Sequence, residues 1–445
     1  MKTTVVYLVI LCLIVSCTNG ETKHVRKSNS DGSEAWGYVE VRPKAHMFWW
    51  HYKSPYRVEN PSKPWPIILW LQGGPGASGV GIGNFQEVGP LDTFLKPRNS
   101  TWLKKADLLF VDSPVGAGYS FVEGNQKDLY VKSDEEAAQD LTKLLQQLFN
   151  KNQTLNQSPL FIVAESYGGK IAVKLGLSVI DAVQSGKLKL HLGDFVFSWG
   201  PLLKHVSRLD DNGLDSSNSL AKKIKTQIKN GEYVGATQTW MDLENLISSK
   251  SNFVDFYNFL LDTGMDPVSL TTSLKIKKEE KIKKYSRYLN DMRSLSDVED
   301  VEGDLDKLMN GVIKKKLKII PNDLIWGNNS DDVFTAMEAA FMKPVDELLA
   351  TGVDVTIYNG QLDVICSTSG TEAWVHKLRW EGLEEFKKME REPLFCESDR
   401  TTRGFTKSYK NLHFYWILGA GHFVPVDEPC VALKMVGEIT KSPQL

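Results

Sequence analysis

The chain has 445 residues, and its 53 lysines and arginines are balanced by 55 acidic residues, which gives a formal net charge of -2. This balance gives no reason to expect a nucleic-acid partner. At about 150 residues per domain the length allows up to three units, but a large α/β sheet with an inserted cap accounts for it without them.

The first twenty residues are predicted to be a secretory signal peptide. Lys2 precedes an unbroken apolar stretch from Val5 to Val15, and small and polar residues follow as far as Gly20. The stretch is too short to span a bilayer. We therefore expect residues 1–20 to be removed and the mature chain, beginning near Glu21, to enter the secretory pathway with no membrane anchor.

A glycine-rich loop follows the apolar run Ile67-Ile68-Leu69. Its sequence is Trp70-Leu71-Gln72-Gly73-Gly74-Pro75-Gly76. A glycine pair at a strand end lets backbone amides converge, as in the oxyanion hole of an acyl-transfer enzyme. Taken without the serine, the loop is better explained as an ordinary turn, because Gly-Pro-Gly clusters are among the commonest turn sequences.

Ser166 lies in a pattern typical of a nucleophile elbow. The apolar run Phe161-Ile162-Val163-Ala164 ends at Glu165-Ser166-Tyr167-Gly168-Gly169, and a helix is predicted from Lys170 to Val183. A sharp strand-to-helix reversal requires very small residues two before and two after the serine, which Ala164 and Gly168 provide. Ala164 departs from the strict pattern, which has glycine there.

Residues 204–342 are predicted to form a helical cap inserted into the sheet. This region is polar and poor in strand patterns, and its apolar residues have helical spacing in 221–228 and 243–259. Its lysine-rich stretches are best explained as solvated helix faces. The predicted organisation is therefore a signal peptide at 1–20, an α/β core at 21–203, the cap at 204–342 and the rest of the core at 343–445.

Two further segments complete a possible triad. The strand-like run 353–358 breaks at Asn359-Gly360, so Asp363 is expected on a loop just past a strand end. A second apolar run, 414–418, ends in Gly419-Ala420-Gly421-His422. The order serine, aspartate, histidine is that of α/β-hydrolases, in which the aspartate orients the imidazole that takes the serine proton.

Together these segments resemble the serine carboxypeptidase family of the α/β-hydrolase fold, and within it most of all the retinoid-inducible serine carboxypeptidases. The resemblance runs nearly end to end and is clearest from Trp36 to Pro201 and from Lys315 to Ala432. Further segments that carry it are Asn84-Phe85-Gln86-Glu87-Val88-Gly89-Pro90, Val111-Asp112-Ser113-Pro114-Val115-Gly116-Ala117-Gly118-Tyr119-Ser120 and Phe341-Met342-Lys343-Pro344.

The resemblance implies an α/β-hydrolase fold with a mostly parallel central sheet and a helical cap, and an exopeptidase that releases C-terminal residues from peptides and proteins. It assigns Ser166 as nucleophile, His422 as general base and then acid, and Asp363 as the group that orients the imidazole. The backbone amides of Gly74 and Tyr167 would form the oxyanion hole.

The same resemblance places Gln72, Glu87 and Glu165 around the terminal carboxylate of the substrate, with Trp70 as a wall. Two carboxylates repel a third at neutral pH, but they become hydrogen-bond donors once they share protons. Substrate binding should therefore strengthen on acidification, which suits a lysosomal or secreted protein. By composition alone, Glu165 would be explained equally well as a solvent-exposed charge.

Four departures from the family pattern bear on activity. Gln72 replaces an asparagine, and Ala77 stands where many members have a cysteine. The chain also passes from Asp194 almost directly to Ser198-Trp199-Gly200-Pro201, which has the form of a deletion beside the site. The helix that follows Val345 is expected to be about a turn short.

The cysteines and glycosylation sequons suit an oxidising lumen. Cys366, Cys396 and Cys430 remain after the signal peptide, which allows one bridge and one free thiol. The sequence has no paired Cys or His spacing for a metal and no phosphate loop, so no cofactor and no metal are expected. Four Asn-x-Ser/Thr sequons begin at Asn99, Asn152, Asn156 and Asn328.

Two other classes of function stay open at this point. An esterase, thioesterase or acyltransferase would use the same triad, but it would have no use for a carboxylate-binding group. A lumenal binding or protective protein that has lost turnover is the second, because a shortened segment beside the site disturbs the geometry that catalysis requires. The sequence does not indicate an oligomeric state or a residue preference.

Overall fold

The computed structural model describes residues 24–58, 64–150, 155, 158–184, 199–263, 265, 268, 305–337, 345–396 and 399–442. The predicted signal peptide and the sequons at Asn152 and Asn156 lie outside these residues. So do the segment after Asp194 up to Ser198 and residues 341–344. No helix in the described part is long and apolar enough to cross a membrane.

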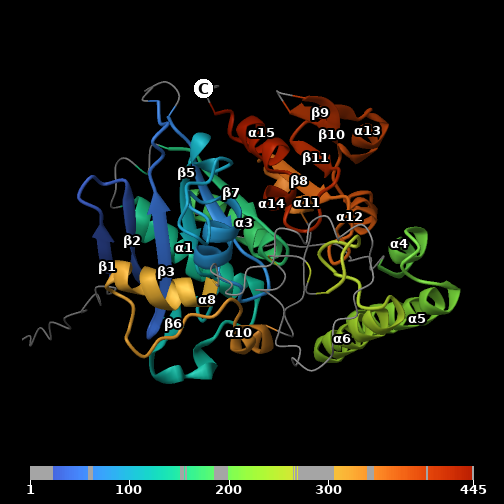
Figure 1. The fold of residues 1–445 in the computed structure, drawn as a ribbon, viewed down its shortest axis with the longest axis horizontal. Helices are drawn as coiled ribbons and strands as arrows, with labels where there is room; N and C mark the ends of the chain where they lie inside the picture. Colours follow the sequence, from blue (N-terminus) through green and yellow to red (C-terminus); the bar gives the residue numbers. More distant parts are fainter. Residues whose placement is uncertain are drawn as a thin grey trace, which may run out of the picture.

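The first sheet combines antiparallel outer strands with parallel strands next to the site (Figure 1). Strands β1, β2, β3 and β5 pair antiparallel in that order, whereas β5, β4 and β7 are parallel, and the short β6 pairs with β3. The strands are β1 (His24–Ser28), β2 (Glu34–Arg42), β3 (Ala45–Tyr52), β4 (Ile67–Leu71), β5 (Asp107–Val111), β6 (Phe121–Val122) and β7 (Leu160–Ala164).

A second sheet follows later in the chain, in the order β8-β11-β10-β9. Strands β8 and β11 are parallel, and the outer pairs are antiparallel. Strand β8 extends through Gly360, two residues beyond the predicted strand end at Tyr358, because Asn359 and Gly360 both pair with β11. The strands are β8 (Val355–Gly360), β9 (Glu392–Cys396), β10 (Asp399–Tyr409) and β11 (Leu412–Ile417).

Both sheets are covered by helices, which confirms the predicted α/β class. The sheets are mixed and not mostly parallel as predicted, because six of the nine strand pairings in the described residues are antiparallel. Helix α1 (Asp134–Phe149) begins at the N-cap Ser133, whose hydroxyl accepts from the amide of Glu136, and it packs with α3 (Gly168–Gln184). Their apolar side chains share one core with the strands. The second sheet is accompanied by α11 (Asp346–Ala350), α12 (Thr368–Val375), α13 (Leu383–Lys388), α14 (Val424–Asp427) and α15 (Pro429–Thr440).

The opposite face of the first sheet is covered by η1 (Gly79–Val88) and by residues 305–337. Apolar side chains of both segments join one core with the strands, and the indole of Trp36 donates to the carbonyl oxygen of Leu317 at 3.0 Å. In Figure 1 the later segment, drawn in orange, runs across the lower parts of β1, β2 and β3. It contains α8 (Leu305–Leu308), η7 (Met309–Ile313), α9 (Lys314–Leu317) and α10 (Asp331–Ala336).

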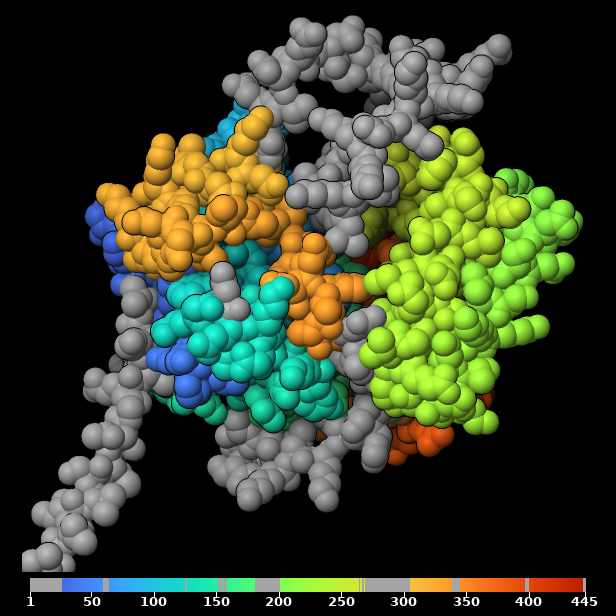
Figure 2. All heavy atoms as spheres, turned by 90° about the horizontal axis from the view of Figure 1, so that it is seen from below, coloured from blue at the N-terminus to red at the C-terminus, as the bar shows by residue number. Residues whose placement is uncertain are grey.

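Residues 199–263 contain a separate helical unit. Helix α5 (Asp211–Lys229) packs along α6 (Tyr233–Lys250), with the short α4 (Trp199–His205) beside them, and Figures 1 and 2 show this unit as a lobe beside the sheets. Helix α6 ends at Lys250, before the end of the predicted helical pattern at Phe259. The region predicted as one cap thus divides into this lobe and the segment 305–337 on the first sheet.

The second half of the chain contains a disulfide, and its sheet is separate from the first sheet. A disulfide joins Cys396 of β9 to Cys430 of α15, which leaves Cys366 free. In the described part of the chain no backbone ladder connects β7 with β8, so each is an edge of its own sheet. The chain between them includes residues 185–198, where the sequence predicted a deletion.

Candidate active site

Ser166 stands on the tight turn between β7 and α3. Its φ is 55°, in the left-handed region, and the amide of Gly169 bonds its carbonyl oxygen at 3.0 Å. A Cβ added to Gly168 would lie 2.5 Å from the carbonyl oxygen of Leu71 on β4, so only glycine fits there. Ala164 is a strand residue with no such requirement, which explains why alanine is accepted. The turn leaves Ser166 exposed.

The glycine loop after β4 lies directly against this serine. A Cβ on Gly73 would lie 2.7 Å from the Cβ of Ser166, and the neighbouring Gly74 has a φ of 104°. The amides of Gly74 and Tyr167 donate no hydrogen bond to any residue that the structure describes. Both predicted oxyanion donors are therefore available beside the serine.

Asp363 and His422 form a buried pair at the ends of β8 and β11. His422 Nδ1 lies 2.8 Å from Asp363 Oδ2, and the other carboxylate oxygen accepts from the amide of Cys366 at 2.9 Å. The amide of His422 donates to the carbonyl oxygen of Tyr257 at 2.8 Å. With Nδ1–H directed at the carboxylate, Nε2 is the ring atom that can accept a proton.

Cys366 connects this pair with the serine. Its thiol is hydrogen-bonded to Ser166, and its sulfur lies within 4.8 Å of ligand atoms of Asp363 and His422. These three side chains have the spacing of a metal site. Burial, together with the nearby charge of Asp363, raises the pKa of the Cys366 thiol, so the thiolate that metals bind is disfavoured.

A buried carboxyl pair lies next to these groups. Glu87 is 1% exposed and Glu165 is 3% exposed. Gln72 Nε2 donates to Oε1 of Glu165 at 2.8 Å and to Oε1 of Glu87 at 3.2 Å, while Trp70 Nε1 donates to Gln72 Oε1 at 2.7 Å. The structure thus brings together all three residues predicted to bind a carboxylate, with Trp70 behind them.

Burial sets the protonation of this pair. It raises the pKa of Glu165 well above the ordinary range, and the charges of Glu87 and Asp363 raise it further. Burial also raises the pKa of Glu87, although the hydrogen bonds from Glu165 and Gln72 partly offset the effect. The pair therefore keeps a proton to higher pH than two exposed glutamates would.

Sequence reasoning missed Asp112, which holds the loops under the site together. Its carboxylate accepts from Ser78 Oγ at 2.6 Å and from the amides of Val80 and Tyr119 at 3.0 and 2.8 Å. The Val111 to Ser120 segment was recognised only as a family motif. Nothing in its sequence indicates that Asp112 accepts hydrogen bonds from the loop around Ser78. Tyr257 and Tyr358, which also lie beside the site, carried no sequence signal at all.

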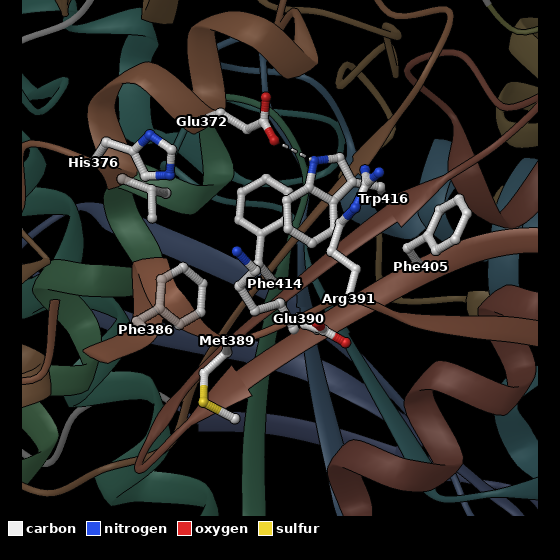
Figure 3. A pocket seen from close by; sticks show the side chains of 11 residues that line it. Glu372, His376, Phe386, Met389, Glu390, Arg391, Phe405, Phe414 and Trp416 are labelled. Atoms are coloured by element: carbon white, nitrogen blue, oxygen red, sulfur yellow. Dashed lines mark hydrogen bonds between the residues drawn. The ribbon is translucent and has the colours of Figure 1, made fainter. Parts of the chain in front are cut away.

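One cavity in the described residues belongs to another part of the molecule. It has a volume of about 400 Å³ and lies between α12, α13 and the face of β10 and β11 (Figure 3). Trp416 Nε1 donates to Glu372 Oε1 at 2.8 Å there, and the guanidinium of Arg391 lies 4.6 Å from the ring centre of Phe405. No predicted site residue lines it, so it is not part of the active site.

Of the two sequons within the described residues, Asn99 is exposed and Asn328 is half-buried.

Comparisons with known proteins show the family to which the chain belongs. Residues 25–442 match a family described as serine carboxypeptidase. The chain is 96% identical to serine carboxypeptidase-like 51 of Arabidopsis thaliana over 461 residues, with both chains covered completely. It is 42% identical to the retinoid-inducible serine carboxypeptidase of Mus musculus, which covers 98% of this chain and 97% of that protein.

The fold has a solved counterpart. The crystal structure of a prohormone-processing carboxypeptidase from Saccharomyces cerevisiae superposes with a TM-score of 0.72 at 19% identity, covering 92% of this chain and 91% of that one.

The alignment with the Arabidopsis relative also bears on the predicted deletion. Its 461 positions exceed the 445 residues of this chain by 16, so the relative has residues that this chain lacks. This supports the prediction of shortened segments near Asp194 and Val345 without placing them. By the family match and by these identities, the chain belongs to the serine carboxypeptidases, a family of hydrolases that act on peptide bonds.

Proposed function

We propose that this protein releases C-terminal amino acids from peptides at acidic pH through an acyl-enzyme formed on Ser166. The observation that carries the proposal is the buried Glu87–Glu165 pair, held by Gln72 beside the Asp363–His422 pair. An esterase or acyltransferase has no need for protonated acids at this place, whereas a free carboxylate on the substrate requires hydrogen-bond donors.

The proposed chemistry follows from the order of the groups. The Ser166 hydroxyl oxygen attacks the scissile carbonyl carbon while Nε2 of His422 takes the hydroxyl proton, and Asp363 stabilises the imidazolium. The Gly74 and Tyr167 amides donate to the oxyanion. When the C–N bond breaks, His422 returns the proton to the leaving amine, and a water molecule then releases the acyl group by the same steps.

The pH dependence is proposed to arise from the carboxyl pair. Below the pKa values of the pair, protonated carboxyls donate to the substrate carboxylate. Above them, two anions face a third and binding weakens. Such a profile fits work in an acidic lumen, so we place the protein in the secretory pathway, either secreted or lysosomal.

Release of the C-terminal amino acid from N-blocked dipeptides, measured from acidic to neutral pH, tests this function. Wild-type protein and its Ser166→Ala variant are compared side by side. Release that depends on Ser166 and fades towards neutral pH is expected. Serine-independent release, or release that increases towards neutral pH, would overturn the proposal.

A catalytically impaired binding protein is the second candidate, and one observation favours it. In the described residues no ladder joins β7, which precedes Ser166, to β8, which precedes Asp363. A catalytic geometry divided between two sheets is less firmly held than one on a single sheet. Assaying the 96% identical Arabidopsis relative under the same conditions provides the comparison, since inactivity of this chain alone would favour the second candidate.

A further inference from the structure

Gln72 has no hydrogen-bond donor left for a substrate. Its carbonyl oxygen accepts from the indole of Trp70, which fixes which end of the amide is the nitrogen. A primary amide has two N–H donors, and both are used within the protein, one on Glu165 and one on Glu87. Gln72 therefore orients the carboxyl pair, and a substrate carboxylate must find its donors elsewhere.

Tyr358 offers an unused donor at this place. It lies on β8, five residues before Asp363, and its ring packs against the core that contains Trp70. Its hydroxyl oxygen is buried and has no hydrogen-bond partner among the described residues, although part of the ring remains accessible. A buried O–H without an acceptor is unfavourable, so an acceptor from outside the chain would be stabilised there.

The charged groups around Tyr358 show where this donor lies. Its hydroxyl is within the electrostatic field of Glu165, Glu87 and Cys366, the first two of which are the carboxyl pair. Three residues on neighbouring elements also face the pair. The charges of His422 and Arg98 lower the pKa of Glu87, and the charge of Asp363 raises the pKa of Glu165. Burial and these anions raise the pKa of Tyr358 well above 10, so the phenol remains a neutral donor wherever the enzyme works.

We propose that the hydroxyl of Tyr358 donates a hydrogen bond to the C-terminal carboxylate of the peptide substrate, and so helps to distinguish a free acid from an amide. This inference rests on the proposed function, because it assumes that the carboxyl pair receives the substrate's C-terminus. The substrate carboxylate would accept from protonated Glu165 and from Tyr358. Unlike Glu165, Tyr358 would keep its proton at neutral pH.

The test measures binding in a Ser166→Ala background, where turnover does not interfere. Calorimetry compares an N-blocked dipeptide with its C-terminal amide, with and without Tyr358→Phe. A hydrogen bond to a charged group implies that the substitution weakens binding of the acid by about 10- to 100-fold. Binding of the amide should change by less than about twofold, within the scatter of a neutral substitution.

Tyr415→Phe is the matched control. Tyr415 is the residue of β11 in register with Tyr358, and its hydroxyl donates to Glu438 Oε2 at 3.1 Å on α15. This variant should bind both ligands as the parent does. Because the Tyr358 hydroxyl has no partner among the described residues, Tyr358→Phe should also leave Tm unchanged or raise it, which separates lost binding from lost folding.

The outcomes separate this inference from the proposed function. Equal weakening of acid and amide by Tyr358→Phe, or no weakening of either, would overturn the role of Tyr358. So would a Ser166→Ala protein that does not prefer the acid to the amide. Absence of turnover in the wild-type protein, with acid-selective binding intact and dependent on Tyr358, would overturn only the proposed catalysis.

Discussion

Asp363 holds His422 with one carboxylate oxygen and its own loop with the other. Oδ2 lies 2.8 Å from His422 Nδ1, and Oδ1 accepts from the amide of Cys366. With both oxygens engaged, the carboxylate cannot rotate without breaking a hydrogen bond, and both side chains are buried. The imidazole is thereby fixed in the tautomer that carries its proton on Nδ1, so Nε2 is the atom that can accept one.

Asp363→Asn is therefore expected to lower kcat far more than it changes KM. An amide that presents N–H to Nδ1 favours the wrong tautomer, and the loss in a triad is about 10⁴-fold. Steady-state kinetics on an N-blocked dipeptide at acidic pH measures both constants. A loss of less than about tenfold would show that Asp363 does not orient the base.

Glu165→Gln is expected to flatten the pH dependence of KM. The pKa of Glu165 is raised by burial and by Glu87, so in the wild-type protein KM should rise once the pair ionises on approach to neutral pH. Glutamine is a neutral donor at every pH, so the variant should bind peptide acids better than wild type at neutral pH. A C-terminal amide substrate serves as control, and an equally steep rise in KM in the variant would contradict this role.

Gly73, which contacts Ser166, and Gly169, which follows Ser166 in the chain, provide a paired test of the oxyanion loop. A Cβ on Gly73 would lie 2.7 Å from the Cβ of Ser166, whereas a Cβ on Gly169 would have nothing within 4 Å. Gly73→Ala should therefore lower kcat by about 100-fold or more through displacement of the serine or the loop. Gly169→Ala should leave kcat unchanged, and equal effects of the two substitutions would show that the close approach is unimportant.

Local sequence patterns, together with their order along the chain and the family resemblance, were sufficient to propose the triad residues but not the groups that support them. Ser166, Asp363 and His422 follow strand patterns, and the glycines beside them are required by tight turns, so each was visible within about ten residues of sequence. Asp112 accepts from three residues on two separate stretches of chain, and Tyr358 faces acids that lie about 200 and 270 residues earlier. Such relationships exist only after folding.

The division of the sheet was equally beyond local patterns. An apolar run indicates β7 and alternation indicates β8, but neither pattern says which strands pair, and in the described residues β7 and β8 belong to different sheets. The comparison of segment lengths with family members indicated a deletion between Asp194 and Ser198. The effect of such a deletion on the pairing of β7 and β8 could not be deduced from local sequence patterns.

Loss of the disulfide should destabilise the second half of the protein. Cys396 and Cys430 are 34 residues apart and tie β9 to α15. Closing a loop of that length stabilises a fold by about 4 kcal/mol in the chain-entropy description. A Cys396→Ser/Cys430→Ser double variant should unfold at lower urea concentration, whereas Cys366→Ser should be sensitive to reducing agent like the parent. Unchanged stability of the double variant would contradict a bridge between these residues.

Conformational stability should decrease as the pH rises from about 4 to 6. Burial raises the pKa of both Asp107 and Asp112 to about 6, although each accepts hydrogen bonds. Between an unfolded pKa of 3.8 and this value, the native state binds more protons than the unfolded state, so the free energy of unfolding falls with pH. His51 opposes this, because burial lowers its pKa to about 4 and the native state binds fewer protons up to the unfolded value of 6.5.

Because two acids outweigh one histidine, the free energy of unfolding should fall overall as the pH rises. The raised pKa values of Glu87 and Glu165 lower it in the same direction. Urea unfolding at about pH 5 and about pH 7.5 should therefore give the higher midpoint at the lower pH. Asp112→Asn should be less stable than wild type at both values, because Asp112 receives three donors, but its difference between the two should be smaller. A midpoint that rises with pH would mean that His51 outweighs the acids, and the fold would then have no intrinsic preference for an acidic compartment.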